Sequence, residues 1–217
     1  MRAAFFDLDK TLVRVNTGPL YVRWRIRRRQ MSLADLARVS WWSLEYTLGV
    51  LDADAVSRAA ASTLAGVQEA TFRAECAEWV LEEVLPQVTD VARAELSRRR
   101  EEGFVCALLT GTSPYVAEPV AEALGVEHVL CSRVRVREGR FTGELEPPLC
   151  YGPGKVARAR RWAGTHGADL SRSVFYTDSV TDLPMLEAVG EPRVVNPDPR
   201  LERVARRRGW TVERWTR

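Results

Sequence analysis

An apolar run near the N-terminus ends abruptly at two acidic residues, and this stretch constrains the chain more than any other. Ala3–Phe6 has the length of a buried strand, and Asp7 and Asp9 follow it. Alternate residues of an extended chain share a face, so the two carboxylates can point the same way. They repel each other unless a cation lies between them or one keeps its proton. The stretch therefore indicates a Mg²⁺ and phosphate site; the alternative is a surface turn after an edge strand.

Strand-like and helix-like stretches alternate through the rest of the chain. Phe104–Leu109 is a continuous apolar run, Val174–Tyr176 and Arg193–Val195 are shorter ones, and helical patterns separate them. This alternation predicts a doubly wound α/β core, which is a parallel sheet covered by helices on both faces. We also expect Val129–Val136 and Phe141–Leu145 to pair as a hairpin.

The region from residue 15 to residue 84 has helical periodicity and no strand pattern. Ser32 is positioned to begin one helix, Asp54 a second and Thr71 a third. We therefore expect a core domain made of residues 1–14 and 85–217. A helical cap domain, residues 15–84, would be inserted after the first strand.

Three polar residues come directly after strand-like runs, namely Asp7, Thr110 and Asp178. In doubly wound sheets the ligand site lies beyond the carboxyl ends of the strands. We therefore expect these residues to meet at one edge of the sheet, although they are far apart in the sequence.

Four motifs in this order resemble those of the haloacid dehalogenase-like hydrolases. They are Phe5–Leu12, Leu108–Ser113, the segment around Lys155, and Tyr176–Leu186. More narrowly, the chain is similar to subfamily IB, the subgroup that includes phosphoserine phosphatase, and the resemblance covers nearly the whole sequence. It implies a Rossmann-like core with a helical C1-type cap. It also implies a Mg²⁺-dependent phosphatase that works through an aspartyl-phosphate.

The resemblance assigns roles to the acidic residues. Asp7 would attack phosphorus, and Asp9 would protonate the leaving oxygen and then accept a proton from water. The carboxylates of Asp7 and Asp178, with the backbone carbonyl of Asp9, would ligate Mg²⁺, which prefers oxygen ligands. Asp182 lies one helical turn beyond Asp178 and would hold a metal-bound water.

The phosphate group would be held by Thr110, Gly111 and Lys155. The chain has 32 lysines and arginines, yet Lys10 and Lys155 are its only lysines. A lysine kept against this bias indicates a position that needs a compact ammonium group. Both lysines lie inside the motifs, and we expect a functional charge at Lys155 in particular.

Two departures from phosphoserine phosphatases concern the substrate. Asn16 stands where those enzymes have a glutamate that holds the substrate ammonium, and Thr181 stands where they have an asparagine. We therefore expect a small phosphorylated metabolite other than phosphoserine. Two alternatives remain: phosphotransfer to an alcohol, or a non-catalytic protein that binds a phosphate ligand or an anionic membrane.

Composition limits the partners and the location. The net charge of +3 is too small to indicate a nucleic-acid partner, and no apolar run reaches membrane-spanning length. No signal peptide is recognisable at the N-terminus, so we expect a cytoplasmic location. The basic run Arg23–Arg29 is typical of a solvated helix face, although it could contact anionic lipid. The sequence leaves the oligomeric state open.

The four cysteines and the two histidines show no ligand spacing. Cys76, Cys106, Cys131 and Cys150 have no paired C-x-x-C arrangement, which favours reduced thiols. His128 and His166 look isolated, and we assign them no role.

Overall fold

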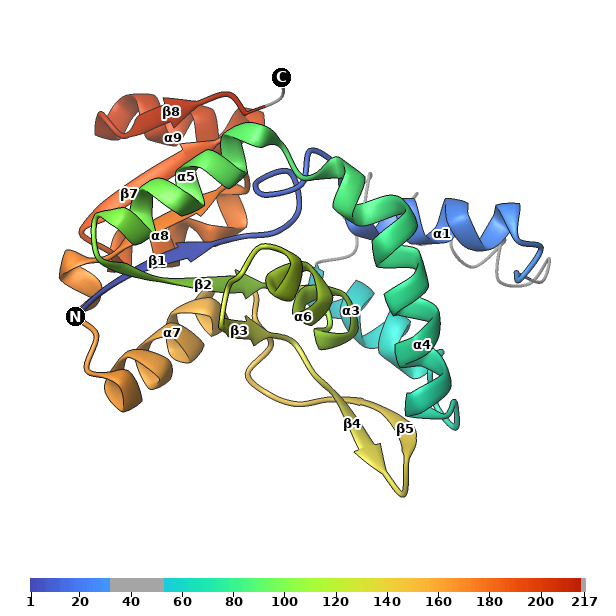
Figure 1. Cartoon of the computed structure of the whole chain (residues 1–217). Helices are drawn as coiled ribbons and strands as arrows, with labels where there is room; N and C mark the ends of the chain where they lie inside the picture. The colour runs from blue at the N-terminus through green and yellow to red at the C-terminus, as the bar shows by residue number, and fades with distance from the viewer. Residues whose placement is uncertain (32–52, 216–217) are drawn as a thin grey trace.

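A sheet of six parallel strands forms the centre of the computed structural model, which describes residues 1–31 and 53–215 (Figure 1). The strand order is β3-β2-β1-β6-β7-β8. Their bounds are Arg2–Phe6 for β1, Phe104–Thr110 for β2, His128–Cys131 for β3, Val174–Thr177 for β6, Glu191–Val195 for β7 and Thr211–Glu213 for β8. The order reverses at β1, so the edge beyond β1 and β6 is the expected ligand position in such a sheet.

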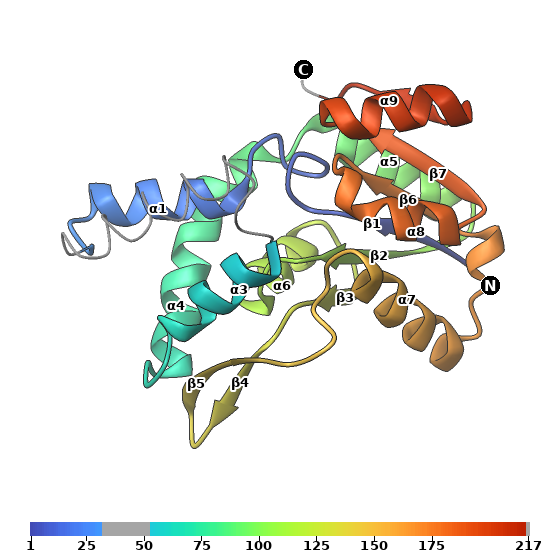
Figure 2. The same cartoon turned by 180° about the vertical axis from the view of Figure 1, so that it is seen from behind.

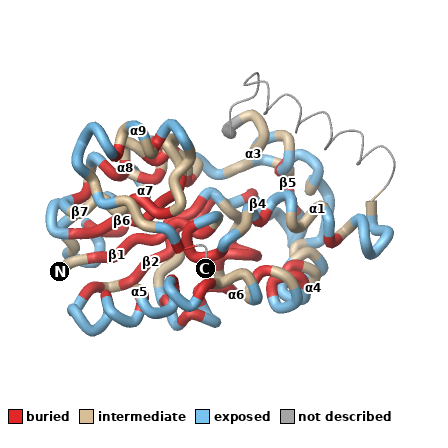
Figure 3. Tube along the Cα trace, turned by 90° about the horizontal axis from the view of Figure 1, so that it is seen from above, coloured by how far each residue is buried: buried red, intermediate tan, exposed pale blue. Residues whose placement is uncertain are grey.

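Helices cover both faces of this sheet, as the alternating pattern predicts (Figure 2). One face packs on α5 (Asp90–Glu101) and α6 (Pro114–Ala123), and the other on α7 (Pro153–His166), α8 (Leu183–Ala188) and α9 (Pro199–Arg208). Adjacent residues of β1 serve opposite cores: Phe6 packs with the first helices and Phe5 with the second. Buried residues accordingly follow the strands through the centre of the molecule (Figure 3). The predicted α/β fold class is confirmed.

The predicted hairpin forms, but its first strand is shorter than expected. It consists of β4 (Val134–Arg137) and β5 (Arg140–Leu145). The prediction of one strand over Val129–Val136 is wrong, because the first part of that range is β3, which pairs with β2 in the main sheet. The chain leaves the sheet at Ser132, whose hydroxyl accepts a hydrogen bond from the backbone of Cys150 instead.

Helices between β1 and α5 lie beyond the carboxyl ends of β1 and β2 (Figure 1). We call residues 15–84 the insertion. It contains α1 (Thr17–Arg27), α3 (Ala53–Ser62), α4 (Glu69–Trp79) and a π-helical turn, Val80–Val84, and a 3₁₀ turn, Leu85–Gln87, follows it. The helix predicted to begin at Ser32 lies outside the described residues.

The chain enters and leaves the insertion at adjacent points. Val13 forms an antiparallel bridge with Val88. The amide of Thr89 donates to the carbonyl of Leu12, and the amide of Arg14 donates to that of Gln87. The two connecting segments therefore run side by side.

The insertion is also joined to the hairpin by backbone hydrogen bonds. Gly66 donates to the carbonyl of Phe141, and the amide of Phe141 donates to the carbonyl of Val67. The rings of Phe72, Tyr115 and Phe141 meet edge to face, with centroids 5.3–5.4 Å apart. An apolar cluster thus fixes the start of α4 against both α6 and the hairpin.

All four cysteines are free, as expected for reduced thiols, and all four are buried. Across residues 1–31 and 53–215, no helix has the length and apolar character needed to cross a membrane.

Candidate active site

Asp7 and Asp178 lie next to each other because β1 and β6 are neighbours. Phe6, the last residue of β1, pairs in register with Tyr176, and the amide of Asp7 donates to the carbonyl of Tyr176. Asp178 comes directly after β6. Both residues are only 8% exposed. The ends of two neighbouring strands therefore bring two carboxylates together in one largely buried position, as the sequence predicted.

Lys155 connects two of the predicted acidic residues. Its ammonium nitrogen lies 3.1 Å from Oδ1 of Asp7 and 2.6 Å from Oδ2 of Asp182. The side chain rises from the first turn of α7 and is buried. A Cβ at Gly154 would lie 1.8 Å from the carbonyl oxygen of Leu149, so only glycine fits beside this lysine. The scarce lysine is thus held at the centre of the acidic cluster.

The acidic cluster is short of positive charge. Burial, with further repulsion from Asp182 and Asp9, raises the pKa of Asp7 to about 6, although Lys155 acts in the opposite direction. Burial and the charge of Asp7 raise the pKa of Asp178 to about 7. Raised pKa values of this origin report carboxylates that lack a compensating cation. The donor set therefore fits a hard divalent cation.

The number of ligands matters for the kind of ion. Among the residues that the structure describes, no three acidic, histidine or cysteine side chains come within reach of a single metal ion. Mg²⁺ commonly uses one or two carboxylates and keeps several waters. Asp7 and Asp178 could supply two such carboxylates. Oδ2 of Asp182 already accepts hydrogen bonds from Lys155 and from the hydroxyl of Thr177, both at 2.6 Å.

Asp9 faces the start of the insertion. Its Oδ1 accepts a hydrogen bond of 3.0 Å from the amide of Thr17, the first residue of α1. Burial raises the pKa of Asp9, and the hydrogen bonds of Thr17 offset part of that effect. A raised pKa keeps the carboxyl protonated closer to neutral pH, which suits a proton donor.

Thr110 and Gly111 lie where β2 ends. Thr110 is buried, and its hydroxyl accepts a hydrogen bond of 3.2 Å from the amide of Thr112. A Cβ at Gly111 would be 3.5 Å from the carbonyl oxygen of Cys150, which is an ordinary contact. The protein itself does not require glycine there. The start of α6 at Pro114 faces the same pocket through Ser113.

The loop after β7 supports the site, and sequence reasoning missed it. The amide of Asp198 donates to the carbonyl of Asp178, and its Oδ2 accepts from the amide of Val180. The side-chain amide of Asn196 donates a hydrogen bond to the carbonyl of Lys10. Lys10 itself adopts a left-handed backbone conformation, with φ 51°. Asp198 also caps α9, and an aspartate before a proline at a helix start was the available signal.

One pocket of about 850 Å³ joins these residues to the insertion. The two predicted substrate residues, Asn16 and Thr181, both line it. Asn16 caps α1 by accepting a hydrogen bond from Gly18, and the hydroxyl of Thr181 bonds that of Ser179. The pocket continues to the inner sides of α1, α3 and α4, where its walls are Tyr21, Arg25, Ala61, Leu64, Phe72, Glu75, Cys76 and Trp79.

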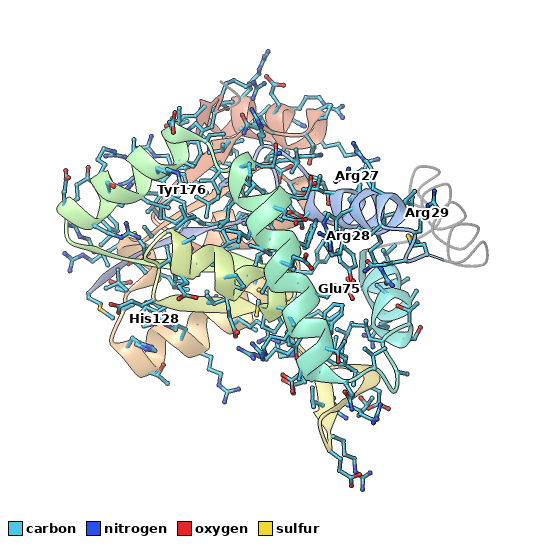
Figure 4. The ribbon with its side chains drawn as sticks, turned by 45° about the vertical axis from the view of Figure 1, so that its right-hand side comes forward. Arg27, Arg28, Arg29, Glu75, His128 and Tyr176 are labelled. Atoms are coloured by element: carbon cyan, nitrogen blue, oxygen red, sulfur yellow. The ribbon has the colours of Figure 1, made fainter. Side chains whose placement is uncertain are left out.

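The basic run Arg23–Arg29 is largely paired within the protein. Arg28 donates to Glu78 and Glu82 at 2.9 Å, and Arg27 pairs with Glu83. These acids lie on α4 and the π-helical turn after it, so the run binds α1 to α4 (Figure 4).

The expectation that the two histidines are isolated is wrong. His128 begins β3 and His166 ends α7, and their ring centroids lie 4.9 Å apart, with Trp162 beside both. The start of β3 and the end of α7 are brought together by the fold, a proximity that spacing along the chain cannot reveal. Burial and the nearby His166 lower the pKa of His128.

The sequence and the fold were compared with those of known proteins. The family model described as haloacid dehalogenase-like hydrolase matches residues 4–187. A probable phosphatase of Mycobacterium tuberculosis is 33% identical over 99% of this chain and 76% of its own length. A histidinol-phosphatase of Neisseria meningitidis is 27% identical over 96% of both chains. A structure of a phospho-aspartyl intermediate analogue of phosphoserine phosphatase has the same fold, with a TM-score of 0.70 at 20% identity over 100% of this chain and 94% of that one.

Proposed function

Because the chain belongs to the haloacid dehalogenase-like hydrolases, and several of its relatives are named phosphatases, we propose that it hydrolyses a small phosphomonoester through an aspartyl-phosphate on Asp7. The observation that carries the proposal is the position of Lys155, whose ammonium lies within 3.1 Å of Asp7 in a buried cluster of acids. The cation neutralises charge where a phosphoryl group would approach, and positioned charge of this kind is the main requirement of phosphoryl transfer.

The first step belongs to Asp7 and Asp9. An oxygen of the Asp7 carboxylate forms a bond to phosphorus while the ester P–O bond breaks. Asp9 gives its proton to the departing oxygen, so that an alcohol leaves instead of an alkoxide. The amide of Thr17 orients the carboxyl of Asp9, and Thr110 and Lys155 hold the phosphoryl oxygens.

The second step returns the enzyme to its starting state. Water attacks the phosphorus of the aspartyl-phosphate, and Asp9, now ionised, accepts its proton. Phosphate leaves and the Asp7 carboxylate is restored. Mg²⁺, held by Asp7, Asp178 and the backbone carbonyl of Asp9, would supply further positive charge at the phosphoryl group. Asp182 fixes Lys155 and would hold a water of that ion.

The position of the pocket also supports a division of the chain into two domains. We assign the core to residues 1–14 and 85–217 and the cap to residues 15–84. The support is that the insertion helices line the pocket opposite the acidic cluster. A pocket walled on both sides suits a small phosphorylated metabolite better than a folded macromolecule. The pairing of Arg27 and Arg28 gives little support to binding of an anionic membrane.

Hydrolysis of an aryl phosphate tests the proposal. The wild type, Asp7→Asn and the control Asp90→Asn, which changes an exposed acid at the start of α5, are each assayed with Mg²⁺ and with a chelator. We expect turnover that requires both Mg²⁺ and Asp7 and that survives in the control. Turnover by Asp7→Asn at the wild-type rate would exclude Asp7 as nucleophile. Added acceptor alcohols would reveal transfer as a phosphorylated alcohol.

A further inference from the structure

Glu75 is an acidic residue on an otherwise apolar side of α4. Its helical neighbours Phe72, Cys76 and Trp79 all line the same pocket. The Glu75 side chain is 23% exposed, whereas that of Glu78, one turn on, is 52% exposed. Figure 4 shows Glu75 on the side of α4 that is turned towards α1. A carboxylate kept partly out of water among apolar side chains is costly unless it has a partner.

One oxygen of Glu75 is held within the protein. The hydroxyl of Tyr21 donates to Oε1 at 2.7 Å, and Nε of Arg25 lies 3.5 Å from the same atom. Burial and the hydrogen bond to Glu75 raise the pKa of Tyr21, so its hydroxyl stays a donor. Within the part of the chain that the structure describes, Oε2 accepts no hydrogen bond. Tyr21 thus fixes the carboxylate and leaves one oxygen for a ligand.

Aromatic rings surround this carboxylate. The ring of Tyr21 meets that of Trp79 at 5.0 Å and that of Phe72 at 6.4 Å, both edge-on. We call Tyr21, Phe72, Glu75 and Trp79 the aromatic–acid cluster. Aromatic faces attract cations, and cages of aromatic rings bind ammonium ligands. The Glu75 carboxylate adds a negative charge to such rings here. The guanidinium of Arg25 lies 5.8 Å from the Tyr21 ring, within the usual distance of a cation–π contact.

The cluster and the acidic site belong to one pocket. Asp7, Thr110 and Lys155 line one part of it, and the aromatic–acid cluster lines another. A molecule with a phosphate at one end and a second functional group at the other can contact both parts when its length matches the distance between them.

We propose that the aromatic–acid cluster binds a protonated amine of the substrate while the phosphate of the same molecule lies at Asp7. This inference rests on the proposed phosphatase function and names its substrate class, an amine-bearing phosphomonoester. Glu75 is the residue that determines specificity. Asn16 does not bind the amine, because its side-chain oxygen already accepts the hydrogen bond that caps α1.

Arg25 does not turn the cluster into a carboxylate site. Its side chain is 35% exposed, and one of its terminal nitrogens donates to the carbonyl of Gln30. Water therefore reaches the Arg25 side chain, although its Nε, the atom 3.5 Å from Oε1 of Glu75, is itself buried. A substrate carboxylate would also meet the acid and the aromatic faces, which repel it.

The test measures selectivity with matched substrates. The probes are ω-aminoalkyl phosphates of increasing length and n-alkyl phosphates of the same lengths. For each pair, kcat/KM of the amine is divided by kcat/KM of the alkyl compound. In the wild type we expect the ratio to exceed one and to peak at the chain length that spans the pocket. In Glu75→Gln we expect it to fall about ten- to a hundred-fold, mainly through KM, because a charge-assisted hydrogen bond is lost.

Two further variants control this experiment. Glu78→Gln removes an acid from the outer face of the same helix, where it pairs with Arg28, and should keep the wild-type ratio. Tyr21→Phe removes the bond that orients Glu75 and should lower the ratio less than Glu75→Gln does. Circular dichroism confirms that each variant is folded.

The outcomes separate this inference from the proposed function. A wild type that hydrolyses both series in an Asp7-dependent manner without preferring amines would overturn the inference and leave the phosphatase function standing. So would an equal fall of the ratio in Glu75→Gln and Glu78→Gln. A wild type that hydrolyses neither series nor an aryl phosphate would refute the function itself.

Discussion

The backbone amide of Thr17 donates a hydrogen bond of 3.0 Å to the carboxylate of Asp9. The first residue of α1 thereby orients the group that we propose as general acid and base. Since α1 also lines the pocket through Tyr21 and Arg25, the helix next to the proposed substrate site is hydrogen-bonded to the proposed proton donor.

Thr17→Pro should impair proton donation selectively. Proline is well tolerated at the first position of a helix, where it removes the N–H that Asp9 uses. We expect kcat for an alkyl phosphate, whose leaving oxygen needs the proton, to fall at least about ten-fold more than kcat for an aryl phosphate with a good leaving group. Thr17→Val keeps the amide and should show a smaller difference. Equal losses for both substrates in Thr17→Pro would contradict this role.

Asp9→Asn should slow hydrolysis of the intermediate more than its formation on an aryl phosphate. Asparagine cannot take a proton from water, and a good leaving group needs little protonation. We expect intact-protein mass spectrometry to find a phosphorylated chain in Asp9→Asn and none in Asp7→Asn. A phosphoryl group on both variants would place the nucleophile elsewhere.

Lys155→Arg should abolish most activity although it keeps the charge. The ammonium is buried between two carboxylates, and a planar guanidinium has neither the size nor the geometry for that position. We expect kcat to fall about a hundred-fold or more, and the urea midpoint to fall as well. Lys155→Met tests loss of charge at similar size. An arginine variant with a kcat close to wild type would show that any cation suffices.

Stability without metal should decrease as pH rises. The folded carboxyl of Asp178 keeps its proton up to about pH 7, whereas the unfolded one releases it near 3.8. Between these values the folded state binds more protons, so the free energy of unfolding falls with rising pH. We expect a loss on the order of 3 kcal/mol across this range from this group.

Urea unfolding of the chelated protein at pH 5.5 and 7.5 measures this effect. Asp178→Asn serves as control and should respond less to pH. Mg²⁺ should restore stability most at pH 7.5, where the carboxylates are ionised. A chelated wild type that is more stable at pH 7.5 than at pH 5.5 would show that the sign is wrong.

Phe141→Ala should test the joint between the insertion and the hairpin. Phe141 is 2% exposed and meets the rings of Phe72 and Tyr115. We expect a loss of about 3–5 kcal/mol in the free energy of unfolding. Val136→Ala, on the same hairpin at a position 39% exposed, should cost well under 1 kcal/mol. Similar losses in both would mean that the cluster contributes no particular stability.

The sequence predicted what depends on strand ends and little of what depends on helix packing. The proximity of Asp7 and Asp178 could be predicted from the sequence, because neighbouring parallel strands end at the same edge of a sheet. Their approach to Lys155 was expected only through family resemblance, since α7 has to be placed against the sheet first. The stretch after Val195 received no assignment, although its Asn196 and Asp198 support the site.

Glu75 shows why the substrate end of the pocket was harder to predict. It stands within the apolar stripe of Phe72, Cys76 and Trp79, and an acid in that place was the available signal. Its meaning depends on Tyr21, which reaches it from another helix across the pocket. The pairing of Arg28 with Glu78 and Glu82 was hidden for the same reason.

The adjacent entry and exit of the insertion have an evolutionary consequence. Because Leu12 and Thr89 are hydrogen-bonded neighbours, a segment of different length or sequence can begin and end there without moving β1 or α5. Mutations that reshape the wall around Glu75 then leave Asp7, Asp178 and Lys155 in place. Descendants of one ancestor can in this way acquire new metabolites while inheriting the same core residues, provided that the start of the inserted segment still orients Asp9.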